Sequence, residues 1–215
     1  MNVLLDHFAL FREGFVGTVE LTFVSALIAL VLGVVIAGFR VSPVPPLRIF
    51  GTVWVTVLRN TPLVLLFLIA FFIVPQVFFP GMSSYLLAVL ALGFYTSSFV
   101  CEAVRSGINT VPVGQAEAAR SIGLTFLQTL RLVVLPQATR TVLAPLSSIF
   151  IALTKNSAIA GAFSNKELFT VQKDLSDLGY NIVTIFFWIA LAYLIITFAI
   201  SRLFTWLEAR MGVVR

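Results

Sequence analysis

The most constraining feature of this sequence is a stretch without any charged residue that runs from Asn60 to Cys101. A membrane-spanning helix needs about 20 mostly apolar residues, within a range of about 17–25, so this stretch is too long for one span. Residues 75–84 interrupt its middle with two prolines, a glycine and two serines, which favour a turn. The stretch therefore predicts two spans joined by a turn, at about residues 51–74 and 85–104.

Three further apolar stretches reach or approach spanning length, at about residues 14–39, 138–154 and 178–201. Hydrophobic residues make up 60% of the chain and charged residues 11%, whereas soluble domains carry about 25% charged residues. A soluble chain of this composition could not cover its own surface, but lipid solvates an apolar exterior. The sequence thus predicts an all-α integral membrane protein with five transmembrane helices, forming a single domain over residues 1–215.

Lysine and arginine are distributed unevenly over the segments between these spans. Cytoplasmic loops carry an excess of these residues, so the bias predicts an external N-terminus and an internal C-terminus. The net charge of +5 then reflects cytoplasmic loops rather than nucleic-acid binding. In this orientation the inner segments hold Arg40, Arg48, Arg105, Arg120, Arg131, Arg140, Arg202, Arg210 and Arg215, and the outer segments hold Arg12, Lys155, Lys166 and Lys173.

The loop at residues 111–136 is too charged to span a membrane, yet its sequence is typical of helices. Pro112 suits a first helical turn, and Gly123 stands where a helix can end in a left-handed residue. Thr125 and Gln128 have the spacing of a capping box, which predicts that a second helix starts there. Two interpretations fit this pattern: a surface link between spans, or a short helix that docks into a groove of a soluble partner.

The same loop resembles the EAA loop of ABC importer permeases. It contains Glu117-Ala118-Ala119, three residues, Gly123, nine residues, and then Val133 followed by Leu135-Pro136. The resemblance implies the ABC type I importer permease architecture, in which this loop is a cytoplasmic coupling helix that sits in a cleft of the ATP-binding subunit. The coupling residues that it implies are Glu117, Ala118, Ala119, Arg120, Gly123, Leu135 and Pro136.

Three shorter motifs extend the resemblance to the polar amino-acid uptake family of histidine, glutamine and glutamate type. These are Arg59-Asn60-Thr61-Pro62-Leu63, the run from Glu102 to Ile108, and Leu153-Thr154-Lys155-Asn156-Ser157. The sequence departs from the family pattern at Asn60 and Ser106, where glycine is usual, and at Asn156, where aspartate is usual. These variants are most similar to glutamate permeases, which implies a polar amino acid as cargo, with glutamate first and glutamine or a basic amino acid as alternatives.

Several residues of these motifs are candidates for the substrate pathway, because charged groups within a membrane are costly and often functional. The Arg59 guanidinium can bind a carboxylate in bidentate fashion; alternatively, it extends to the inner surface, or pairs with Glu102 or with an acidic residue of a partner protein. Glu102 and Arg105 are three residues apart and can pair on one helix face. The predicted pathway residues are Arg59, Asn60, Thr61, Glu102, Lys155 and Asn156.

The sequence contains no phosphate-binding Gly-x-x-x-x-Gly-Lys motif. Nothing in it indicates an enzyme, a catalytic residue or a metal site, and we expect no cofactor, with ATP bound by a partner subunit. The resemblance implies ABC ATPase subunits, a second permease subunit that is identical or different, and an extracytoplasmic substrate-binding protein, all at a bacterial cytoplasmic membrane. An ion-coupled secondary carrier and a non-transporting scaffold are the alternatives from other classes. Such a carrier would normally show repeated halves and broken mid-membrane helices, and the sequence indicates neither.

Overall fold

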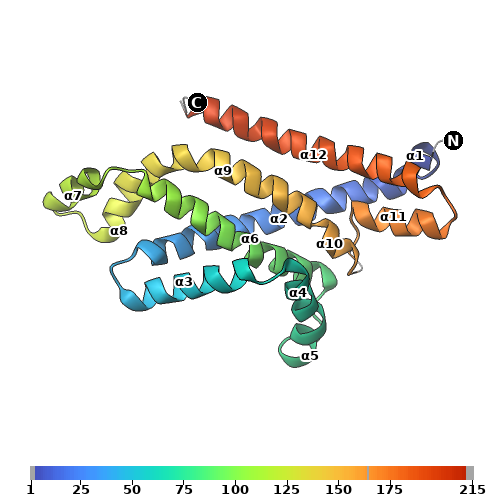
Figure 1. Ribbon diagram of the computed structural model, residues 1–215, viewed down its shortest axis with the longest axis horizontal. Helices are drawn as coiled ribbons and strands as arrows, with labels where there is room; N and C mark the ends of the chain where they lie inside the picture. Colours follow the sequence, from blue (N-terminus) through green and yellow to red (C-terminus); the bar gives the residue numbers. More distant parts are fainter. Residues whose placement is uncertain (1–2, 164, 212–215) are drawn as a thin grey trace.

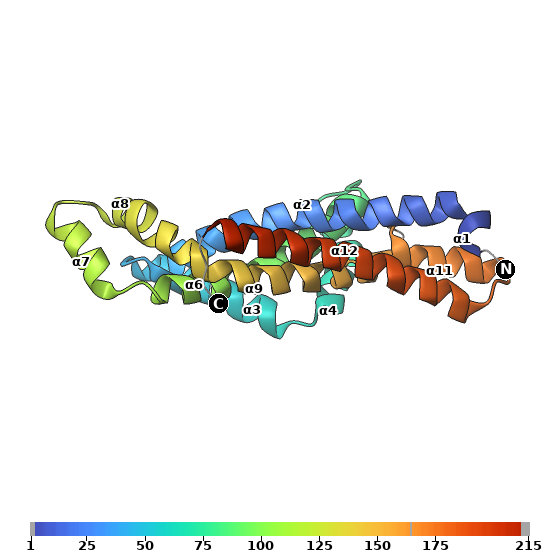
Figure 2. The same cartoon turned by 90° about the horizontal axis from the view of Figure 1, so that it is seen from above.

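A computed structural model describes residues 3–163 and 165–211 of the chain, and this part is helical without a strand. Four of its helices are long and apolar enough to cross a membrane, and a bent helix pair brings the number to as many as five. The predicted all-α membrane fold is thus confirmed. The bundle is elongated: the N-terminus and α11 lie at one end, and α7 and α8 lie at the other (Figures 1 and 2).

The centre of the bundle is formed by α2 (Phe8–Val41) and α6 (Ser84–Asn109). Both are longer than the spans predicted at residues 14–39 and 85–104. Glycines let the two helices approach closely, as is common between membrane helices. A Cβ at Gly33 would lie 2.5 Å from Val100 Cγ1, and a Cβ at Gly93 would lie 2.8 Å from Ile28 Cγ2.

The span predicted at residues 51–74 is a bent helix pair and not one continuous helix, so the expectation that no membrane helix is broken is wrong. The chain forms α3 (Pro45–Asn60), breaks, and continues through α4 (Leu63–Leu68), a π-helical turn and α5 (Val74–Val77), with a bend of 103° at the break. The cause is Pro62, which disfavours helical geometry at the residue before it. Thr61 is accordingly extended, with φ −91° and ψ 126°, so α4 and α5 project sideways from the bundle (Figure 1).

The loop at residues 111–136 folds as a short helix, a corner and a second helix. The first is α7 (Val113–Ser121), and the second starts with α8 (Phe126–Thr129). It continues through a π-helical turn at Leu130–Val134 into α9 (Leu135–Asn156), so that helix extends almost without interruption from Phe126 to Gly161. The span predicted at residues 138–154 therefore lies within a much longer helix.

The end of the bundle opposite to α7 contains a helix that we did not predict, α11 (Leu168–Asp177). It packs between α2 and α12 (Ile182–Arg210), next to the short helices α1 (Val3–Asp6) and α10 (Ala158–Gly161). The last span thus begins later and ends later than the predicted residues 178–201. Glycines again permit the contact, since a Cβ at Gly17 would lie 2.0 Å from the Lys166 carbonyl oxygen.

Candidate functional site

The corner after α7 is built by a glycine in a left-handed conformation. Gly123 has φ +92°, which residues with a Cβ adopt only at a cost. Its N–H donates to the Arg120 carbonyl at 3.0 Å, and the next N–H, of Leu124, donates to the Ala119 carbonyl at 3.2 Å. These two bonds form a Schellman motif, which ends α7 and reverses the chain.

A capping box starts the helix that follows the corner. The Thr125 side chain accepts the Gln128 N–H at 3.3 Å, and the Gln128 side chain accepts the Thr125 N–H at 2.9 Å. Both bonds satisfy N–H groups that a helix start would leave unpaired. The predicted geometry of a short helix, a glycine corner and a second helix is therefore confirmed. We call residues 112–129 the α7 corner.

The residues of the α7 corner that resemble the EAA loop are mostly exposed. Glu117, Ala118 and Arg120 are exposed, whereas Ala119 is buried on the opposite side of the helix. Ile122, next to Gly123, is 80% exposed. Such exposure is unusual for an isoleucine and typical of a surface that a partner covers. At the start of α9, Leu135 is partly buried and Pro136 is exposed.

A second group of predicted residues gathers around one carboxylate, Glu102 of α6. Arg105, one turn further along α6, donates to Glu102 Oε2 through Nη2 at 2.9 Å and through Nε at 3.1 Å. Arg40 of α2 donates to Oε1, and Arg59 Nη1 of α3 lies 3.7 Å from the same atom. We call these four residues the Glu102 cluster. The predicted pair of Glu102 with Arg105 is confirmed, and so is the alternative in which Arg59 pairs with Glu102.

The Glu102 cluster joins three helices and carries more positive than negative charge. Three guanidinium groups face one carboxylate, which leaves two positive charges without a counter-charge within the cluster. Arg40 is the least exposed of the three, with 16% of its side chain accessible, and Arg59 is the most exposed, with 44%. Arg59 also stacks over the Phe99 ring at 5.2 Å, so its charged group lies between the carboxylate and an aromatic face.

Phe99 leads from the Glu102 cluster into a cleft between α6 and α9, which we call the α6–α9 cleft. Its volume is about 300 Å³, and polar and aromatic side chains alternate on its walls. A cleft with a few polar groups on mostly apolar walls is typical of sites for small ligands. The residues that line it are Tyr95, Thr96, Phe99, Ser148, Ile149, Ala152, Leu153 and Asn156.

The structure places the predicted pathway residues in different surroundings. Arg59 and Glu102 meet in the Glu102 cluster, and Asn156 lines the α6–α9 cleft. Asn60 and Thr61 end α3 at the bend, and Lys155 is exposed near the end of α9; none of these three lines the cleft.

Sequence reasoning missed Arg40 and the aromatic wall of the cleft. Arg40 carried a usable signal: it ends an apolar helix, and an isolated glutamate in another apolar helix needs a cation nearby. The cleft wall carried none, because Tyr95 and Phe99 are indistinguishable in the sequence from ordinary apolar helix residues.

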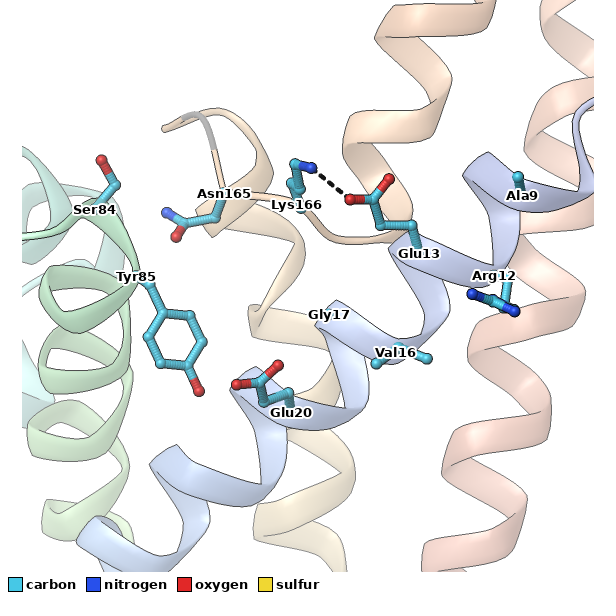
Figure 3. Close-up of a pocket in the computed structure, with 10 residues that line it drawn as sticks. All are labelled: Ala9, Arg12, Glu13, Val16, Gly17, Glu20, Ser84, Tyr85, Asn165 and Lys166. Carbon is cyan, nitrogen blue, oxygen red and sulfur yellow. Dashed lines mark hydrogen bonds and ion pairs between the residues drawn. The ribbon is translucent and has the colours of Figure 1, made fainter.

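A hollow of about 640 Å³ opens near the end of the bundle that carries α11, between α2, the start of α6 and the segment before α11. We call it the α2–α6 hollow. Lys166 pairs with Glu13 across it, and Tyr85 points toward Glu20 (Figure 3). Glu20 forms no ion pair with any residue among 3–163 and 165–211. The Tyr85 hydroxyl is buried and faces Glu20.

The segment beside this hollow is fixed by Glu167, a fully buried carboxyl at the start of α11. Its side chain accepts the Thr170 N–H at 2.9 Å and the Tyr193 hydroxyl at 2.6 Å. Burial raises the pKa of Glu167 above its usual range, and the hydrogen bonds oppose that shift only in part. Gly161 leaves room for the carboxyl, because a Cβ there would lie 2.0 Å from Oε1.

The chain matches a known protein family over most of its length. The model of the family described as binding-protein-dependent transport system inner membrane component matches residues 29–213. This range contains the α7 corner, the Glu102 cluster and the α6–α9 cleft.

Individual proteins are similar over nearly the whole chain. The probable glutamine ABC transporter permease protein GlnM of Bacillus subtilis (strain 168) is 34% identical over 98% of this chain and 97% of its own length. The glutamate transport system permease protein GluC of Corynebacterium glutamicum is 41% identical over 84% of both chains. A solved amino acid ABC transporter crystallised with histidines superposes with a TM-score of 0.86 at 30% identity, covering 96% of both chains.

Proposed function

Because this chain belongs to the family of binding-protein-dependent transport system inner membrane components, we propose that it forms the membrane pathway of an ATP-driven importer for glutamate. It is a multi-pass permease subunit of an amino-acid ABC importer, and its relatives include glutamine and glutamate permeases. In this proposal ATP binds to a separate ATPase, and the chain itself has no catalytic role.

The observation that carries the proposal is the α7 corner. It is a short exposed helix at one end of the bundle, held in a fixed direction by Gly123 and followed by a helix that continues into the membrane. A helix of this kind can dock into a groove of a soluble protein. The contact surface that we assign to the ATPase is formed by Glu117, Ala118, Arg120 and Ile122. Gly123 shapes the corner, and Leu135 and Pro136 begin the helix α9 behind it.

The mechanism is alternating access. Closure of two ATPase subunits around ATP draws the α7 corners of two permease subunits together, and the far ends of the spans open. Hydrolysis returns the pathway to the inward-open state. Five spans do not readily enclose a pathway alone, so a second permease subunit, identical or different, is part of the proposal.

The choice of glutamate rests on charge. A glutamate molecule carries one more carboxylate than glutamine, and the two uncompensated positive charges of the Glu102 cluster favour an anion. Arg59 is the guanidinium that is most exposed and most weakly held. We propose that Arg59 binds the carboxylate of the transported glutamate. Asn156 and Ser148 in the neighbouring cleft offer hydrogen bonds to the rest of that glutamate.

The same proposal assigns the two ends of the bundle to the two sides of the membrane. The end with α7 faces the cytoplasm and the end with α11 faces outward, in a bacterial cytoplasmic membrane, as the lysine and arginine bias suggests. The α2–α6 hollow then faces the extracytoplasmic binding protein. Glu20 within it is exposed and has a carboxylate that a docked protein can pair.

The test compares two glycines that have the same local structure at opposite ends of the protein. Gly123 after α7 and Gly179 after α11 have φ of +92° and +83°, form the same pair of Schellman hydrogen bonds, and would each place a Cβ in open space. Gly123→Ala and Gly179→Ala should therefore cost similar strain, about 1–2 kcal/mol. Each variant is reconstituted in proteoliposomes with the ATPase and the binding protein.

We expect Gly123→Ala to reduce ATP-driven glutamate uptake and to weaken co-purification of the ATPase. Gly179→Ala should keep both glutamate uptake and co-purification of the ATPase, although its thermal stability should fall as much as that of Gly123→Ala. Equal uptake by the two variants would contradict the role of the α7 corner. Uptake by the purified chain without any ATPase would contradict the importer itself and favour an ion-coupled carrier.

Glutamine is the second candidate cargo, because a probable glutamine permease is 34% identical over nearly the whole chain. Uptake of radiolabelled glutamate, competed with unlabelled glutamine, arginine or aspartate, separates the candidates. Stronger competition by glutamine than by unlabelled glutamate would assign glutamine as the cargo.

A further inference from the structure

A long apolar groove separates α2 from α12 on the outside of the bundle. The two helices hardly touch each other, and the groove between them has a volume of about 450 Å³. Its walls are residues of α2 between Phe15 and Leu30 and residues of α12 between Ile195 and Leu207, and Phe150 of α9 closes its floor. All lining residues are apolar except Thr22.

The groove has the direction and length of a lipid chain. At a rise of 1.5 Å per residue, its walls extend about 22 Å along α2 and about 18 Å along α12, which is more than half of a hydrocarbon core about 30 Å thick. The groove is open at the side, because Phe23 is 61% exposed and Leu203 is 52% exposed. Figure 2 shows α2 and α12 side by side, diverging toward the end that carries α11.

Twelve of the 15 lining residues are bulky and Thr22, Ala26 and Ala199 are small, so the lining suits a lipid chain better than a second protein helix. Membrane helices that pack together use small residues, which let their backbones approach, and this chain does so where Gly33 meets Val100 and where Gly93 meets Ile28. The residues that line the groove include no glycine, and most are phenylalanine, leucine, isoleucine or valine. Such bulky walls hold another backbone away, whereas a flexible acyl chain can follow their contour.

Positive charge stands at one end of the groove. Arg210 lies one turn beyond Leu207, the last lining residue of α12, and its guanidinium stacks over Trp206 at 4.5 Å. Arg202, which stacks over Phe198 at 5.1 Å, lies beside the groove and not at its end, because it falls between the lining residues Ile200 and Leu203. Tryptophan and arginine are typical of the membrane interface, and arginines at this depth attract anionic lipid headgroups.

We propose that the α2–α12 groove binds an acyl chain of an anionic phospholipid whose headgroup lies at Arg210. The lipid fills the open side of the space between the first and last spans, outside the core contacts of Phe204 and Ile196. The proposal is independent of the cargo and of the ATPase, since it rests only on the groove and its basic end.

The test measures lipid retention by the purified full-length protein. The protein is delipidated in detergent, incubated with phosphatidylglycerol or phosphatidylcholine, and analysed by native mass spectrometry. Ala199→Trp fills the groove from α12, and Ala26→Phe fills it from α2. Ala190→Trp is the matched control, because Ala190 is an exposed alanine of α12 that does not line the groove.

We expect one retained phosphatidylglycerol in the wild type and in Ala190→Trp, and loss of that lipid in both groove-filling variants. Arg210→Gln should keep the bound chain but reduce the preference for phosphatidylglycerol over phosphatidylcholine about five-fold, the equivalent of about 1 kcal/mol, and Arg202→Gln should reduce it less. Retention of lipid by Ala199→Trp and Ala26→Phe, each with wild-type thermal stability, would overturn the proposal. A crosslink between two copies through Ala199→Cys would overturn it as well, by assigning the groove to a second subunit.

Discussion

Replacing Glu102 with glutamine should destabilise the protein, because Glu102 is the carboxylate that three guanidinium groups share. The amide keeps the shape of the side chain but leaves three positive charges without a counter-charge inside the cluster. Loss of one partner of a fully buried ion pair costs about 3–5 kcal/mol, and an exposed pair contributes about 0.2–1 kcal/mol.

The Glu102 cluster lies between these limits, with 16% of the Arg40 side chain and 44% of the Arg59 side chain exposed. Solvent therefore screens part of the repulsion, and Arg59 can turn outward. We expect a loss of about 1–3 kcal/mol. Thermal unfolding in lipid nanodiscs measures it, at about 2–4 °C per kcal/mol for a chain of this size.

Two further variants decide whether the cluster is the cause. The double variant Arg40→Gln/Glu102→Gln should lose less stability than the two single variants lose together. The reason is that it also removes Arg40, the most buried of the guanidinium groups that Glu102→Gln leaves without a counter-charge. Glu13→Gln breaks the Lys166 pair, whose side chains are 77% and 51% exposed, and should cost little. If Glu102→Gln lowers the unfolding temperature no more than Glu13→Gln does, the structural role of the cluster is refuted.

Three other variants test the cargo site, the helix packing and the buried carboxyl. Arg59→Gln should raise KM for glutamate about 10-fold or more relative to KM for glutamine, since a charge-assisted hydrogen bond is worth about 1.5–3 kcal/mol; equal changes in proteoliposome uptake would contradict the assignment. Gly33→Leu should cost about 1–3 kcal/mol by overpacking against Val100, while Gly38→Leu, which meets no neighbour within 4 Å, should not; similar unfolding temperatures would refute the packing argument. The raised pKa of Glu167 favours its protonated form in the folded state, so its stabilising contribution is complete below the ordinary carboxyl pKa of about 4.3 and is lost as the pH rises through the folded-state pKa. Glu167→Gln should remove this decline from unfolding temperatures measured between pH 4 and 8, and an unchanged decline would show that another group causes it.

The sequence predicted those parts of the fold that depend on local composition. Apolar length located the long helices, because the bilayer accepts only segments that bury their own backbone polar groups. The α7 corner was predictable for a similar reason. A left-handed turn needs a glycine, and a helix start needs a capping side chain, so Gly123 and Thr125 mark their positions directly.

Features that depend on tertiary packing were harder to predict from the sequence. Pro62 marks the break between α3 and α4, but the angle of 103° depends on how α4 packs against α6. The helix α11 escaped prediction because its charged and apolar residues resemble an ordinary surface loop, and its fixation by Glu167 and Tyr193 joins distant parts of the chain. The Glu102 cluster was half predictable: spacing within one helix gave Arg105, whereas Arg40 comes from a helix that is distant in sequence.

One helix connects the α7 corner with the α6–α9 cleft, which bears on how force could reach the cargo. From Phe126 to Asn156 the chain is helical and about 45 Å long. It begins at the capping box of the corner and ends with Asn156 on the cleft wall. A helix is stiff along its axis, so a displacement at the corner moves the cleft wall unless the helix yields in between.

The π-helical turn at Leu130–Val134 and Pro145 are the places where this helix can yield. The π-helical turn lies beside the corner, before the helix packs on α6, whereas Pro145 lies between the corner and the cleft. Bending at the π-helical turn would let the corner rotate while the cleft stays in place. Bending at Pro145 would likewise take up a displacement of the corner before it reaches the cleft wall, so the proposed coupling requires the helix to stay stiff at both places.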